Sequence, residues 1–180
     1  MKIIQAIIIS LILLFSTTNV YGQTCRIEFY LLKKVIMEDS SSSNSIVSDF
    51  HVTLDDLEDS PFITDNEIIS FSILKDTIHS KIRERHIFEL PKTVVNRING
   101  LKIPLCCGVQ FALLVNGEIV YGGYFWNLFS SFGCNGIGAF ANNDKLEVFR
   151  RLPDFGSEDN VWDIRRNSKL FDCLEATNRK

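Results

Sequence analysis

The residues best suited to chemistry are two adjacent cysteines, Cys106 and Cys107, with the histidines His79 and His86 upstream of them. A thiol-dependent hydrolase needs an imidazole that converts the thiol to a thiolate and a third group that orients the ring. No helix start follows these cysteines, because Gly108 leads into an apolar strand pattern. A hydrolase that uses Cys106 or Cys107 with His79 or His86 is therefore an alternative hypothesis and not the first one.

The cysteines are better explained by disulfides. All five follow an N-terminal export signal, and in an oxidising compartment exported cysteines usually pair, with one left over from an odd count. The disulfide candidates are Cys25, Cys106, Cys107, Cys134 and Cys173. Neighbouring cysteines seldom meet disulfide geometry, so we expect Cys106 or Cys107 to pair with Cys134, and the full connectivity stays open.

Patterns for metal or cofactor binding are not recognisable. The three histidines His51, His79 and His86 are scattered, and the acidic residues 55–59 lack the spacing of a calcium loop. We therefore expect no metal and no cofactor. The 22 acidic residues always offer carboxylate pairs, so a glycosidase is neither supported nor excluded.

Aromatic residues gather where the second of two apolar strand patterns ends. A binding hypothesis assigns them, with two serines at the rim, to an apolar patch for a ligand or partner. The set comprises Tyr124, Phe125, Trp126, Phe129, Ser130 and Ser131. The average burial of large aromatics favours another interpretation, in which Tyr124 and Trp126 plug one side of the strand end and Phe125 plugs the other.

The N-terminal residues predict the location of the protein. Lys2, an apolar run and the small-residue stop Val20-Tyr21-Gly22 have the order of a secretory signal peptide, too short for a comfortable membrane span. We expect cleavage after Gly22, which leaves residues 23–180 as one exported domain with no further membrane span. Retention as an anchor and lipidation at Cys25 are the two alternatives.

Composition narrows the class of partner. The net charge of −3 argues against nucleic acid, which requires a basic face. The absence of an Asn-X-Ser/Thr acceptor favours a secreted, periplasmic or cell-envelope location in bacteria over a eukaryotic secretory route. The expected partner is another envelope or secreted protein.

Strand patterns recur along the exported part. Apolar alternation predicts strands over 26–36, 49–54, 111–115, 118–124 and 145–150, and two short strands around a turn within 70–90. Asn116-Gly117 is typical of a two-residue hairpin turn, which makes its flanking strands the middle of the sheet. The Ser-rich residues 40–45 predict a loop.

Helix signals are fewer. Pro91 and Gly100 suit the start and stop of a short helix with Val94, Val95 and Ile98 facing inward. A second helix is expected over 161–178, and Thr64 with Glu67 has the spacing of a capping box. The inward residues of that second helix would be Ile164, Leu170, Cys173 and Leu174.

The stretch HIFELPKTVVNRINGLKIPLCCGVQFALLVNGEIVYGG resembles the α+β periplasmic head segments of the protein-export component SecD. This resemblance covers residues 61–130 and implies a fold, without the membrane helices of that component. The stretch GEIVYGGYFW followed by serines resembles small secreted or lipid-anchored bacterial proteins of unassigned function. That second resemblance implies location and fold and no reaction.

These patterns predict an α+β domain with a mostly antiparallel sheet, one or two short helices packed on one face, and one or two disulfides. The function they favour is a non-enzymatic binding or accessory module of the cell envelope. The alternatives are the thiol-dependent or other hydrolase and a secreted inhibitor-like domain.

Overall fold

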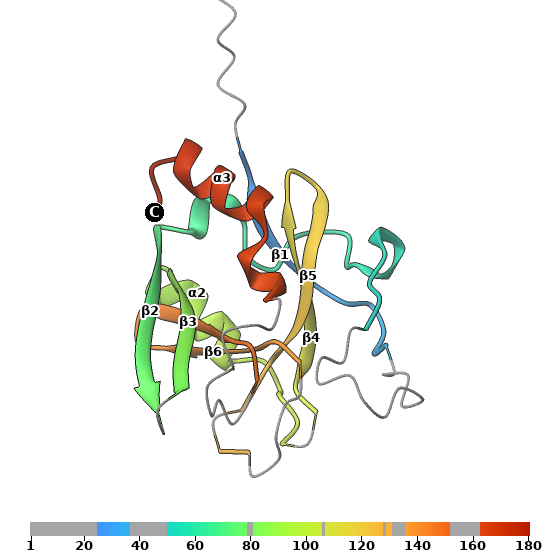
Figure 1. Cartoon of the computed structure of the whole chain (residues 1–180). Coiled ribbons are helices and arrows are strands. Elements are labelled where there is room, and N and C mark those ends of the chain that lie inside the picture. The colour runs from blue at the N-terminus through green and yellow to red at the C-terminus, as the bar shows by residue number, and fades with distance from the viewer. Residues whose placement is uncertain are drawn as a thin grey trace, which may run out of the picture.

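Seven strands form one sheet in the order β1-β4-β5-β6-β7-β3-β2 in a computed structural model of the chain (Figure 1). The structure describes residues 25–36, 50–78, 81–105, 107–127, 129–130, 136–151 and 163–180. The strands are β1 Ile27–Leu31, β2 Ser70–Ile78, β3 Lys81–Glu89, β4 Val109–Val115, β5 Glu118–Phe125, β6 Gly138–Asn142 and β7 Lys145–Phe149. Every strand pair is antiparallel except β5 with β6, so the predicted α+β class with a mostly antiparallel sheet is confirmed.

The β4–β5 hairpin forms where it was predicted. Asn116 and Gly117 both have positive φ, 53° and 80°, which a two-residue turn matched to strand twist requires. The two strands lie inside the sheet, although the central position belongs to β6. Strand β4 is buried on both faces: Phe111 and Leu113 contribute to the main core, whereas Ala112 and Leu114 belong to a smaller cluster on the other face.

Two helices cover the main core, and Figure 1 shows α3 beside the start of β1 and α2 near β6. Helix α2, Lys92–Asn99, begins after Pro91 and ends at Gly100 as predicted, with Val94, Val95 and Ile98 buried. Helix α3, Ser168–Ala176, buries the predicted residues Leu170, Cys173 and Leu174.

Helix α3 is shorter than predicted. The side chain of Asn167 accepts a hydrogen bond from the Lys169 N–H and caps the helix, so Ile164 lies upstream in the 3-10 helix η3, Ile164–Arg166, and is half-buried. Two further 3-10 helices are η1, Leu54–Asp56, and η2, Asp65–Glu67, the latter with the predicted capping box of Thr64 and Glu67.

The strand predicted over 49–54 is wrong in its described part. Residues 50–53 pair with no strand, and Leu54 begins η1. Phe50 and Val52 alternate because both pack over Gly122 of β5, where an added Cβ would lie 2.7 Å from the Phe50 ring. Alternation here reflects packing on a sheet face and not backbone pairing.

Several predictions fall on residues that the structure does not describe. The signal peptide over 1–22, the Ser-rich loop 40–45 and the start of the predicted C-terminal helix at 161–162 all lie outside the described residues. Within the described ranges no helix is both long and apolar enough to cross a membrane.

Candidate functional site

A groove of about 530 Å³ opens where β5 ends and β6 runs on beyond it. Three segments line the groove: the end of α2 with the loop after it, the chain that leaves β5, and β6 itself. The lining residues are Ile98, Asn99, Leu101, Lys102, Ile103, Trp126, Asn127, Phe129, Ala139, Phe140 and Ala141. Most of these side chains are apolar, and Lys102 is the one charged residue among them.

The predicted aromatic set divides at this groove. Tyr124, Phe125 and Trp126 are all buried, with Phe125 in the main core and the other two packed on each other and on Phe50 at the opposite face. Phe129, in contrast, is 92 % exposed. Of the serines, Ser130 is half-buried and Ser131 lies outside the described residues. Ligand binding by this set stays a prediction, and Trp126 and Phe129 are the members that line the groove.

A glycine creates the room for these aromatics. Gly108 has φ of +64°, and an added Cβ would lie 2.8 Å from the Phe125 carbonyl oxygen and 2.9 Å from Cε3 of Trp126. Only glycine adopts this conformation without strain and permits so close an approach. Gly108 therefore allows the end of β5 to pack closely against the chain that precedes β4.

Sequence reasoning missed the buried amide that anchors Tyr124. Gln110 of β4 donates from Nε2 to the Ile36 carbonyl at 2.8 Å and accepts at Oε1 from the Ile36 N–H at 2.7 Å. The same Nε2 lies 3.4 Å from the Tyr124 hydroxyl. A lone glutamine inside an apolar strand was the available signal, because a buried amide needs partners.

The turn that carries Phe129 is closed by Asn127. The Asn127 Oδ1 accepts from the Phe129 N–H at 2.9 Å, and its carbonyl oxygen accepts from the Ser130 N–H at 3.0 Å. The Ser130 hydroxyl in turn donates to the Leu105 carbonyl. These bonds hold the exposed ring at the mouth of the groove and tie it to the loop after α2.

Two of the residues proposed for thiol chemistry, Cys107 and His86, interact with other groups in the structure. Cys107 is disulfide-bonded, and His86 is fully buried with Nε2 3.0 Å from Oε1 of Glu84. Burial lowers the pKa of His86, against the opposing effect of the Glu84 hydrogen bond. Cys106 and His79 lie outside the described residues. No group of three metal-ligating side chains occurs in the described part of the chain.

The surroundings of His86 form a buried ionic cluster. Arg165 of η3, 2 % exposed, donates through Nη1 to the carbonyl oxygens of Glu84 at 3.0 Å and Val148 at 2.9 Å. Its Nη2 pairs with Oδ2 of Asp163 at 2.7 Å, which holds the pKa of that carboxyl below its usual value despite burial. The arrangement attaches the segment before α3 to the sheet.

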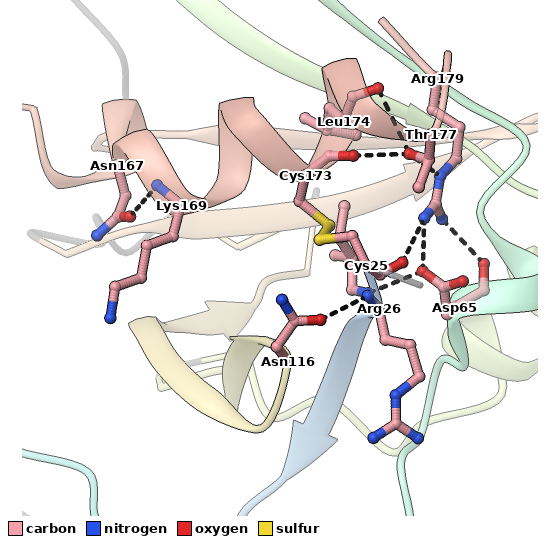
Figure 2. Close-up of a disulfide and its surroundings, with 11 residues drawn as sticks. Cys25, Arg26, Asp65, Asn116, Asn167, Lys169, Cys173, Leu174, Thr177 and Arg179 are labelled. Carbon is pink, nitrogen blue, oxygen red and sulfur yellow. Dashed lines mark hydrogen bonds and ion pairs between the residues drawn. A yellow bond between two sulfur atoms is a disulfide. The ribbon is translucent and has the colours of Figure 1, made fainter. Parts of the chain in front are cut away.

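A disulfide fixes the other end of α3. Cys25 and Cys173 are bonded with a Cα–Cα distance of 5.3 Å, and Figure 2 shows the bond surrounded by polar contacts. Arg179 donates to the Cys25 carbonyl at 3.3 Å and pairs with Asp65 at 2.7 Å, while Thr177 donates to the Cys173 carbonyl at 2.8 Å. The bond thus ties the start of β1 to the last helix.

Cys107 forms a second disulfide. Since Cys25 and Cys173 bind each other, the partner of Cys107 is either Cys106 or Cys134, both outside the described residues. Pairing of Cys107 with Cys134 stays a prediction.

Neither a protein-family model nor a curated protein matches the sequence. Two solved structures with a weak likeness to this chain are a crystal structure of SecDF in its super-membrane-facing form and a structure of SecDF described as a membrane component that enhances protein export. Each covers 86 % of this chain at 11 % identity, with TM-scores of 0.46 and 0.45. The chain spans 19 % and 64 % of their lengths, less than two thirds of either. The resemblance to SecD seen in the sequence thus corresponds to a weak likeness of fold, and this likeness carries no argument about function.

Proposed function

We propose that this protein is an exported binding module of the cell envelope, whose groove binds an apolar, carboxylate-bearing peptide segment of a partner protein. The observation that carries the proposal is the groove itself, with the exposed ring of Phe129 at its mouth and Lys102 on its wall. Its volume lies within the range of pockets that hold small ligands or a few side chains.

The exposed ring supplies a substantial part of the binding energy. Full burial of a phenylalanine side chain contributes about 1.5–3 kcal/mol, equivalent to about 10- to 100-fold in affinity. Phe129 is almost fully exposed in the free protein, so nearly all of this area is available to a partner. A well-packed aromatic at the centre of a contact is also where binding energy concentrates.

Charge selects among apolar ligands. Among the described residues that line the groove none is acidic, and Lys102 is exposed. A solvent-exposed ion pair contributes about 0.2–1 kcal/mol, so a carboxylate on the partner gains orientation more than affinity.

The disulfides support an extracytoplasmic partner. The bond between Cys25 and Cys173 and the bonded state of Cys107 are typical of proteins in an oxidising compartment. A partner segment must therefore be exported or exposed on the envelope.

Selection from a random octapeptide library displayed with free C-terminal carboxylates tests the proposal. We expect enrichment of apolar peptides with an acidic group, and loss of at least tenfold in their affinity for Phe129→Ser. The matched control is Leu54→Ser, which removes a leucine that is 60 % exposed on η1, away from the groove.

A charge reversal completes the design. Lys102→Glu should weaken the enriched peptides about two- to fivefold, whereas Lys92→Glu, at an exposed position of α2 outside the groove, should leave them unchanged. Failure to enrich any peptide, or equal binding to Phe129→Ser and Leu54→Ser, overturns the proposed function.

A further inference from the structure

We infer that the bound segment adds to the sheet as an extended strand, paired with the free edge of β6 at Ala141. The inference rests on the proposed function, and it specifies how the groove recognises its ligand. The groove would then recognise a peptide by its backbone as well as by its side chains.

The direction of the β6 backbone follows from its bonds to β5. The Tyr124 N–H donates to the Ile137 carbonyl at 2.8 Å, and the Trp126 N–H donates to the Ala139 carbonyl at 2.7 Å. Odd-numbered residues of β6 therefore point their backbone groups toward β5, and even-numbered residues point theirs toward β7. By this alternation, Ala141 is the next residue directed away from β7.

Strand β5 ends before it can reach Ala141. The parallel register stops at Phe125 with Ala139, whereas β6 continues to Asn142 in register with β7. In the described part of the chain, the Ala141 N–H has no backbone acceptor on this side. Ala141 is 7 % exposed and lines the groove, so its N–H points into a partly enclosed space.

An unpaired N–H in such a place favours a strand as ligand. A buried backbone donor without a partner is costly, and an extended peptide offers a carbonyl oxygen at the required spacing. Three residues of β6, 140–142, extend beyond its pairing with β5, so the added strand is short.

The walls set the side-chain pattern of that strand. Alternate side chains of an added strand would face Ile98 and Leu101 on the α2 side, and these positions should be apolar. A carboxylate beyond them would lie near Lys102. The predicted ligand is a short, alternating, apolar peptide with an acidic side chain or a C-terminal carboxylate.

Ala141→Pro removes the N–H in question and preserves the bonds from β6 to β7, because Phe140 and Asn142 make those bonds. Calorimetric titration with an enriched octapeptide should show affinity about tenfold lower for Ala141→Pro and unchanged for the control Leu54→Ser, which lies outside the groove. The same peptide carrying backbone N-methyl groups should lose affinity at alternate positions only.

A measurement on the wild-type protein keeps the inference testable even if the proline variant fails to fold. Bound peptide should slow hydrogen exchange of the Ala141 amide at least tenfold, as measured by NMR. If Phe129→Ser abolishes binding but the Ala141 amide exchanges at its free rate and N-methylation has no effect, strand addition is overturned and the groove function stands. If no peptide is enriched, it is the proposed function that is overturned.

Discussion

Removal of the bond between Cys25 and Cys173 should destabilise the protein more than any other single change considered for it. The bond closes a loop with a sequence separation of 148 residues, almost the whole span from residue 25 to residue 180. Replacing both cysteines by alanine in Cys25→Ala/Cys173→Ala keeps the buried surroundings apolar, since the two residues are only 8 % and 2 % exposed.

The magnitude follows from loop closure. A cross-link over about 150 residues lowers the entropy of the unfolded chain by an amount worth about 5 kcal/mol at 25 °C. Single domains are stable by about 5–15 kcal/mol, so the variant should lose a third or more of its free energy of unfolding. The loss arises in the unfolded state, and the folded structure should change little.

Urea unfolding followed by tryptophan fluorescence measures this effect. The midpoint should fall and the m-value should rise, because an unfolded chain without the cross-link is more expanded. Each single variant, Cys25→Ala or Cys173→Ala, also breaks the bond and should cost nearly as much as the double variant. This non-additivity separates the cross-link from side-chain packing.

Two results would refute the reasoning. A loss below about 1 kcal/mol with an unchanged m-value would show that the unfolded chain is not constrained by this bond. Additive losses in the two single variants would place the effect in local packing around each sulfur instead.

Three further changes test the described structure by thermal or urea unfolding. Gly108→Ala should cost about 1–3 kcal/mol, because a Cβ at positive φ meets the Phe125 carbonyl, and more than Gly117→Ala, where nothing lies within 4 Å. Stability should fall as the pH drops below about 6.5, because burial lowers the pKa of His86 and only the unfolded chain then binds its proton. His86→Phe should flatten this dependence of stability on pH. Arg165→Met should cost about 3–5 kcal/mol, since it leaves the half-buried carboxylate partner of Arg165 unpaired.

Local sequence signals predicted those elements whose structure depends on neighbouring residues. The Asn116-Gly117 turn, the Pro91 and Gly100 boundaries of α2 and the capping box at Thr64 all depend on interactions within a few residues. Backbone dihedral preferences and short-range hydrogen bonds determine such features, and both can be deduced from the sequence.

Strand β6 could not be predicted in the same way. Its residues, Gly138 to Asn142, include no β-branched side chain, and three of the five are glycine or alanine. The strand forms because β7 pairs with it along its length and β5 with its first residues, both long-range interactions. Because β6 was not predicted, the groove beside it could not be predicted either. Nothing in the sequence around Ala141 indicates that this residue lines a groove.

The aromatic triplet itself explains why the groove exists. Trp126 packs against Tyr124 at the face opposite Phe125, and the turn at Asn127 then carries the chain away from β6 after only two paired residues. Had β5 continued alongside β6, Ala141 would be paired and the space beside it filled. The side chains that complete the core at the end of β5 thus also leave the edge of β6 open, and the only exposed ring of the set, Phe129, lies beside that opening. Core packing at the end of β5 and the open edge of β6 are therefore two consequences of one sequence feature.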